Sequence, residues 1–236
     1  MHLDKIFRNS LTFVDLSHTL SSQSPSWNGS CGFFSEIKKD YDDMFRVQQF
    51  KMHAGIGTHM DAPSHKFQGS ISIDEVAIEN LFVPLHIIDV SHKSSSTYEI
   101  SVKDILDYES RYGRIKGNSL VIGFTGWCHR FRDSNSYRNP DENGHMHFPS
   151  FSKDAALLLL DRDVAGLGID TLSPDCHDKE YPVHHLFLGK GKYIIENVAD
   201  CSLMMKSGGF AVALPLKIEG ATESPIRLIG CFIKIR

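Results

Sequence analysis

Short apolar runs separated by polar, turn-forming stretches make up most of the chain. Val83–Val90 and Ser119–Phe124 are nearly continuous apolar runs, which is typical of strands buried on both faces of a sheet. Ser101–Tyr112 and Ser152–Arg162 instead space their apolar residues at helical intervals, and each begins with a serine that can cap a helix. The pattern therefore predicts strands and helices that mix along the chain.

The same pattern predicts several further strands: Leu11–Leu16, Arg46–His53, Val164–Asp170, Lys192–Val198, Ala211–Ile218 and Pro225–Ile235. Some consecutive strands are joined by short turns and others by helices, which indicates a mixed sheet. The polar stretch at 128–148 is too long for a simple connection and indicates a functional loop. Because no linker or internal repeat divides these elements, we expect one α/β domain over residues 1–236.

Composition narrows the class of protein. The chain has 236 residues, of which 41% are hydrophobic, and a formal net charge of −4. It can build a sizeable core, but it lacks the basic footprint that nucleic-acid binding requires, and no apolar run approaches the ~20 residues needed to cross a bilayer. Its five cysteines form no Cys-x-x-Cys pair, and its first residues lack the apolar core of a signal peptide. We therefore expect a cytoplasmic protein that binds neither nucleic acid nor membranes.

The segment 53–65, His-Ala-Gly-Ile-Gly-Thr-His-Met-Asp-Ala-Pro-Ser-His, has the densest cluster of reactive side chains. It places His59, Asp61 and His65 within seven residues, and imidazole and carboxylate together are typical ligands of zinc or manganese. In extended backbone, residues two apart share a face, so His59 and Asp61 could hold one ion. His65, beyond Pro63, could then reach back over that ion. A metal or catalytic site explains three such groups in one short segment better than ordinary hydrogen bonding does.

Further ligands must come from elsewhere in the chain, because one short segment rarely completes a metal site. The best downstream candidates are His184 and Glu196. Glu196 lies near the end of an apolar strand, where a buried carboxylate is costly unless it is paired or bound to metal, although a solvent-facing strand end explains it equally well. For His184 alone, the local sequence favours an ordinary surface histidine. Asp175 follows Pro174, and an Asx turn explains it better than a site role does.

Several of these segments, in this order, resemble the cyclase family of metal-dependent hydrolases, which includes bacterial kynurenine formamidase and isatin hydrolase. The family signature is His-x-Gly-Thr-His-x-Asp-Ala-Pro-x-His, and the segment 57–65 matches all but its first position. Similar segments continue along nearly the whole chain: Asp15-Leu16-Ser17-His18, Thr125-Gly126-Trp127, Gly168-Ile169-Asp170-Thr171, and Ser224-Pro225-Ile226-Arg227. A chance match to so many segments in order is improbable.

This resemblance implies a swivelling β/β/α-type fold and a homodimer or homotetramer. It implies that His59 and Asp61 bind a zinc or manganese ion, and that His184 and Glu196 complete the site. His65 would act as acid/base or as a ligand of a second ion. Glu196 or His184 would orient the attacking water, so Glu196 is a candidate for both metal binding and catalysis.

The implied reaction is hydrolysis of a small amide, lactam or ester, and an arylformamidase-like action on carbon–nitrogen bonds fits best. Water bound to the ion would be the nucleophile, because a divalent ion makes hydroxide available at neutral pH. Trp127, Trp27 and Phe131 are candidate pocket walls for a flat substrate. Core packing remains the better explanation for each of these aromatic residues taken separately.

One position departs from the family signature. The first metal-binding histidine of the signature lies four residues before His59, where this chain has Gly55. His53 lies two residues further upstream and, in a regular strand, roughly 20 Å from His59 at ~3.3 Å per residue. Only a turn through the intervening glycines could bring His53 to the ion.

Two alternatives to a hydrolase remain, and the missing histidine motivates the first of them. The first is a catalytically impaired family member that binds a small ligand or serves in regulation; tight ligand binding without turnover would identify it. The second is a lyase or cyclase that uses the same ion, and it would form its product without consuming water. A cysteine nucleophile is a weaker hypothesis, because Cys128 and His129 are adjacent but nothing completes a triad.

Overall fold

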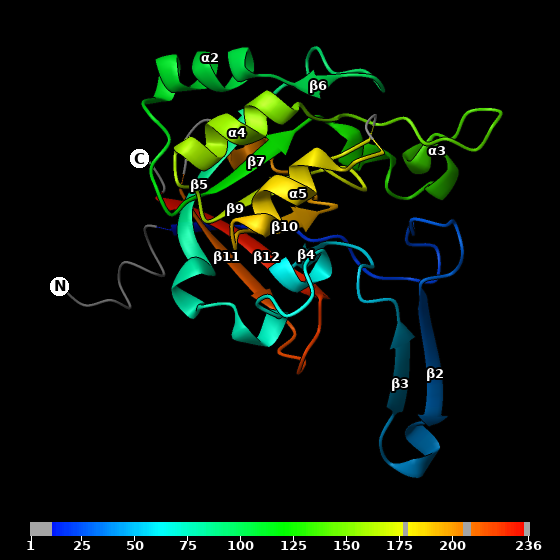
Figure 1. Cartoon of the computed structure of the whole chain (residues 1–236). Helices are drawn as coiled ribbons and strands as arrows, with labels where there is room; N and C mark the ends of the chain where they lie inside the picture. Colours follow the sequence, from blue (N-terminus) through cyan, green and yellow to red (C-terminus); the bar gives the residue numbers. More distant parts are fainter. Residues whose placement is uncertain (1–10, 177–178, 205–208, 234–236) are drawn as a thin grey trace.

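The computed structural model describes residues 11–176, 179–204 and 209–233, which form an α/β body with one projecting hairpin (Figure 1). An eight-stranded sheet has the order β1-β12-β11-β5-β7-β9-β10-β4, and β12 also pairs with β4. That extra pairing closes the sheet into a barrel. The strands are β1 (Leu11–Asp15), β4 (His59–Asp61), β5 (Phe82–Asp89), β7 (Leu120–Phe124), β9 (Gly166–Ile169), β10 (Tyr193–Glu196), β11 (Gly209–Pro215) and β12 (Glu223–Ile233).

The sheet is mixed, as predicted. Strands β5, β7, β9 and β10 are parallel neighbours, whereas β1, β4, β11 and β12 pair antiparallel. All residues of β7 and β9 are buried, which explains their continuous apolar sequences. The chain is therefore an α/β domain with a mixed sheet whose strands β7 and β9 are wholly buried.

Three helices cover the parallel strands on one side (Figure 1). They are α2 (Val102–Tyr112), α4 (Lys153–Asp161) and α5 (Pro182–Gly189). Ser101 and Asp104 form a capping box at the start of α2, and the Ser152 hydroxyl accepts the Ala155 amide at the start of α4. Both predicted caps are confirmed. The polar loop after β7 contains a short helix, α3 (Ser134–Arg138).

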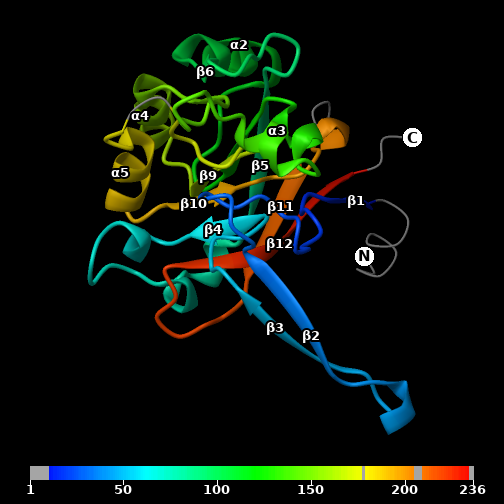
Figure 2. The same cartoon turned by 90° about the vertical axis from the view of Figure 1, so that its right-hand side faces the viewer.

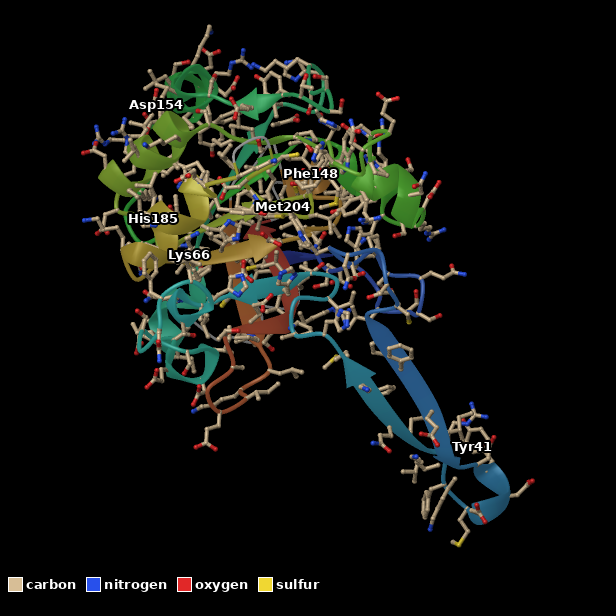
Figure 3. All side chains as sticks on the ribbon, turned by 45° about the vertical axis from the view of Figure 1, so that its right-hand side comes forward. Tyr41, Lys66, Phe148, Asp154, His185 and Met204 are labelled. Carbon is tan, nitrogen blue, oxygen red and sulfur yellow. The ribbon has the colours of Figure 1, made fainter. Side chains whose placement is uncertain are left out.

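Strands β2 (Phe33–Lys39) and β3 (Val47–Met52) form a hairpin that projects from the body (Figure 2). Tyr41 lies at its far end (Figure 3). The apolar pattern predicts β3 but misses β2, because both faces of β2 are exposed and no alternation marks it. A second small pairing joins β6 (Glu99–Ile100) to β8 (Ser150–Phe151). Among the described residues, no helix combines the length and apolar character needed to cross a membrane.

Strand β4 is short, buried and central to the site. It lies between β10 and β12, with His59 opposite Glu196 on one side and Asp61 opposite Glu223 on the other. Met60 points into the barrel core, so its neighbours His59 and Asp61 share the opposite face. The closure of the barrel therefore brings four ionisable side chains from three strands together.

Candidate metal site and cavity

Three buried side chains meet where β4 pairs with β10. The His59 Nε2 atom lies 3.4 Å from Asp61 Oδ1 and 3.4 Å from Glu196 Oε2. The His59 Nδ1–H donates to the Gly57 carbonyl at 2.9 Å, since a carbonyl can only accept. Its other ring nitrogen, Nε2, therefore faces two carboxylates, an arrangement that suits a metal ligand.

His184 approaches the same carboxylates from α5. Its Nε2 lies 3.3 Å from Glu196 Oε1 and 3.6 Å from Asp61 Oδ2. Its Nδ1 is 2.8 Å from Asp175 Oδ2, and a carboxylate on the far ring nitrogen is the usual device that orients a metal-binding histidine. The Asp175 carboxylate also accepts the backbone amides of Val183 and His184. Asp175 thus caps α5 and fixes His184, a role that its local sequence did not predict.

His65 lies on a short 3-10 turn, Pro63–His65, that follows β4. Its Nδ1 is 3.2 Å from Glu223 Oε2, and its side chain is 35% exposed. Two sets of three ligand atoms lie within 4.8 Å of one another: His59, Asp61 and Glu196 in one set, and Asp61, His65 and His184 in the other. Since both sets contain Asp61, its carboxylate is the common element of the cluster.

The charges of the cluster favour a cation. Burial alone would lower the pKa of His59 and of His184, but neighbouring carboxylates outweigh burial and raise both pKa values well above the ordinary one. Burial would raise the pKa of Asp61, yet the two histidines lower it. Asp61 Oδ1 is buried and accepts no hydrogen bond. A carboxylate that lies beside two ring nitrogens and keeps one oxygen without a hydrogen bond fits a divalent ion that takes mixed nitrogen and oxygen ligands.

The cluster opens into a cavity of about 490 Å³. Trp27 and Tyr181 form an aromatic wall with ring centroids 6.4 Å apart, and the Lys66 ammonium lies 5.6 Å from the Tyr181 ring. The lining also includes Gly55, Leu172, Ser173, Asn197 and Glu223. Among the expected wall residues, Trp27 therefore lies at the cavity.

Trp127 and Phe131 do not line this cavity. They belong to a separate buried cluster with Tyr137 and Phe148. The Trp127 indole donates to the Tyr137 carbonyl at 2.8 Å, and Phe131 stacks on His18 with ring centroids 3.7 Å apart. Both aromatic residues have the core-packing role that was the better explanation for each separately.

Asp170 and Cys128 also lie outside the ligand cluster. The Asp170 carboxylate accepts the Thr125 amide at 2.9 Å and the Thr125 hydroxyl at 2.6 Å. It therefore ties the end of β9 to the end of β7. Burial, helped by Asp170, raises the pKa of the Cys128 thiol, which is the opposite of what a thiolate nucleophile needs.

The structure does not bring His53 to the cluster. His53 is an exposed residue at the base of the hairpin, where its amide donates to the Gly32 carbonyl at 2.9 Å. Gly55 does line the cavity. The residue that the sequence analysis missed is Glu223, which contacts His65 from β12. Its only sequence signal is that it directly precedes the family-like segment Ser224-Pro225-Ile226-Arg227.

An α/β barrel with a histidine–carboxylate cluster at strand β4 defines the class of protein, and comparison with known proteins defines the family. The family model named "Cyclase" matches residues 14–176, which is more than half of the chain. The chain therefore belongs to the cyclase family, as its signature segment predicted.

Individual relatives agree with this assignment. The chain is 29% identical over 185 residues to an isatin hydrolase from Roseibium aggregatum, covering 74% of this chain and 70% of that protein. It is 27% identical over 221 residues to a kynurenine formamidase from Bacillus cereus, covering 92% and 96%. The crystal structure of an isatin hydrolase bound to the product analogue thioisatinate superposes with a TM-score of 0.91 at 25% identity, covering 98% and 96%. The relatives thus confirm the predicted fold.

Proposed function

We propose that the protein is a metal-dependent hydrolase that cleaves a carbon–nitrogen bond in a small amide or lactam, with an ester as a further possible substrate. The observation that carries this proposal is the meeting of His59, His184, Asp61 and Glu196, whose ring Nε2 atoms face carboxylate oxygens. The similarity to an isatin hydrolase and a kynurenine formamidase supports the same substrate class.

Zinc and manganese both suit the donor set, because each accepts imidazole and carboxylate ligands. His59, Asp61 and Glu196 would hold one ion, and Asp61 with His184 would hold it from the other side or share a second. When bound, such an ion makes hydroxide available near neutral pH and polarises a carbonyl oxygen. Asp175 keeps the His184 ring oriented for this task.

His65 is the proposed acid/base. The hydrogen bond to Glu223 is the main cause that raises the pKa of His65, and burial opposes it. With Nδ1 held by Glu223, the other ring nitrogen is available to take a proton from water and return it to the leaving nitrogen. The Trp27–Tyr181 wall offers a stacking surface for a flat substrate.

Metal content per subunit tests this proposal first, measured by elemental mass spectrometry on protein purified without chelator or metal-binding tag. We expect stoichiometric zinc or manganese in the wild type, its loss in His59→Ala, and chelator-sensitive hydrolysis of formamides or lactams. A wild type that takes up neither metal after incubation with both would overturn the proposal.

The second candidate function is ligand binding without turnover, and Gly55 is the observation that favours it. Loss of a histidine ligand can impair catalysis while the aromatic cavity is kept. Calorimetric titration with aromatic amides separates the two functions. Tight binding with no product, even in excess metal, would favour the second candidate.

We also propose that the protein acts as a homodimer or homotetramer in the cytoplasm. Several large apolar side chains of the hairpin, such as Phe34, Phe45 and Phe50, are at least half exposed and suit contact with a second copy. The five cysteines are free, which suits a reducing compartment. Light scattering of the purified protein tests the oligomer, and a monomer at micromolar concentration would contradict it.

A further inference from the structure

The space beside Gly55 is occupied by the side chain of Glu223. A Cβ atom added at Gly55 would lie 2.4 Å from Glu223 Oε1 and 3.2 Å from His59 Nε2. Gly55 does not have a left-handed backbone conformation, so its lack of a side chain is not required by the local geometry. A side chain here would overlap the Glu223 carboxylate in its present position, so Gly55 leaves room for that carboxylate.

We propose that Glu223 replaces the absent histidine as a ligand of the ion held by His59 and Asp61. This inference rests on the proposed function, and it names a ligand from a strand that the family signature does not include. The Glu223 carboxylate reaches the cavity from β12, the neighbour of β4. It lies where a side chain at residue 55 would enter the cavity.

Strand register makes this replacement possible. Glu223 is the first residue of β12 and lies directly opposite Asp61 in the antiparallel β12–β4 pair. Directly opposed residues of antiparallel strands have Cβ atoms about 4.5–5.5 Å apart, so two carboxylates in this register can reach one ion. Its side chain is 23% exposed, which leaves it free to adjust to the ion.

The two oxygens of Glu223 have separate tasks in this arrangement. Oε2 lies 3.2 Å from His65 Nδ1 and holds the ring of the proposed acid/base. Oε1 is the oxygen that fills the space beside Gly55. One carboxylate thus links the ion to the residue that moves the proton, which a histidine at residue 55 would not do.

A glutamate in place of the histidine of the signature also changes the chemistry of the metal-binding atoms. Replacing a neutral imidazole with a carboxylate adds a negative charge and a harder ligand, and harder ligands shift selectivity from zinc towards manganese. The ratio of the two metal affinities is therefore a property that reports on Glu223 without any substrate.

The experiment measures zinc and manganese dissociation constants of the metal-free full chain, by competition with a chromophoric chelator. The variants are Glu223→Gln, Glu223→Ala, the double variant Gly55→His/Glu223→Ala, and the control Glu79→Gln, an exposed glutamate outside the cavity. Circular dichroism checks that each variant folds.

We expect Glu223→Gln to weaken binding of both metals by at least about tenfold, and Glu79→Gln to leave it unchanged. Adding Gly55→His to Glu223→Ala should recover most of the loss and raise the zinc-to-manganese affinity ratio above that of the wild type. This rescue separates loss of a ligand from misfolding. Unaltered affinity in Glu223→Gln would overturn this inference alone, whereas a wild type that binds no metal would overturn the proposed function as well.

Discussion

Strand β4 and the hairpin before it are close in sequence and opposite in character. All three residues of β4 are buried, and two of them are ionisable. The hairpin strands are almost entirely exposed, yet they present large apolar side chains such as Phe34 and Phe50. Each region reverses the usual relation between polarity and burial. The reversal at β4 suits the proposed metal site, and the reversal at the hairpin suits the proposed contact with a second copy.

A second exposed apolar surface suits the hairpin as a partner. Phe82 of β5 and Phe210 of β11 stack on the outside of the sheet with ring centroids 5.6 Å apart, and Leu214 lies further along β11. Both surfaces belong to the same chain. Two copies could therefore cover them together, which fits the proposed oligomer.

The largest effect is expected when one carboxylate in β4, and for comparison one in the hairpin, is replaced by its amide. Asp61→Asn should abolish stoichiometric metal binding, weakening affinity by more than about 100-fold, because Asp61 belongs to both sets of ligand atoms. Asp42→Asn, in the exposed 3-10 turn of the hairpin, should leave metal content unchanged. Elemental mass spectrometry after dialysis compares the two, and equal metal content in both variants would contradict the assigned site.

Asp175→Asn tests how far the buried network extends beyond the ligands. Asp175 holds the His184 ring and accepts two backbone amides of α5. We expect metal affinity to fall by about 10- to 100-fold, because the ring loses its charged partner. Chelator competition measures the affinity, with Asp161→Asn as an exposed control at the end of α4. Wild-type affinity in Asp175→Asn would show that capping α5 is its whole role.

The pH dependence of metal binding tests the electrostatics of the site. Carboxylates raise the pKa values of His59 and His184, so these rings hold protons in the metal-free protein that an ion must displace. Lowering the pH strengthens this competition. Apparent affinity should therefore rise with pH, by roughly tenfold per unit for each proton released. Calorimetry in buffers of different ionisation enthalpy counts the protons, and pH-independent binding would contradict this account.

The local part of the site could be predicted from the sequence, and the non-local part could not. His59 and Asp61 share a face because they are two apart in a strand, and that spacing is visible in the sequence. Glu223 is more than 160 residues away and reaches the site only through the β12–β4 register, which no local pattern encodes. Asp175 looked like a turn residue because its partners on α5 lie eight and nine positions later.

The fold shows the same limit. Buried strands such as β5 and β7 have clear apolar runs, so their positions are confirmed. Strand β2 has no buried face and therefore gives no signal. Trp127 and Trp27 look alike as candidate pocket walls, but only tertiary packing places one in the core and the other at the cavity.

The smallest expected effect concerns the hairpin. Phe50→Ser removes an aromatic side chain that is 56% exposed, on the strand that leads towards the site. If a second copy covers this surface, the dissociation constant of the oligomer should rise by about tenfold or more, because buried aromatic residues dominate interface energies. Metal content should not change, since Phe50 does not line the cavity.

Sedimentation velocity over a dilution series measures that shift, and Ile78→Ser, an exposed apolar residue elsewhere on the body, is the matched control. A shift in Phe50→Ser alone would assign the contact to the hairpin. Equal dissociation constants in both variants would show that the exposed apolar residues of the hairpin are not where two copies meet. Of the two regions compared above, only the buried site at β4 would then keep a proposed binding role.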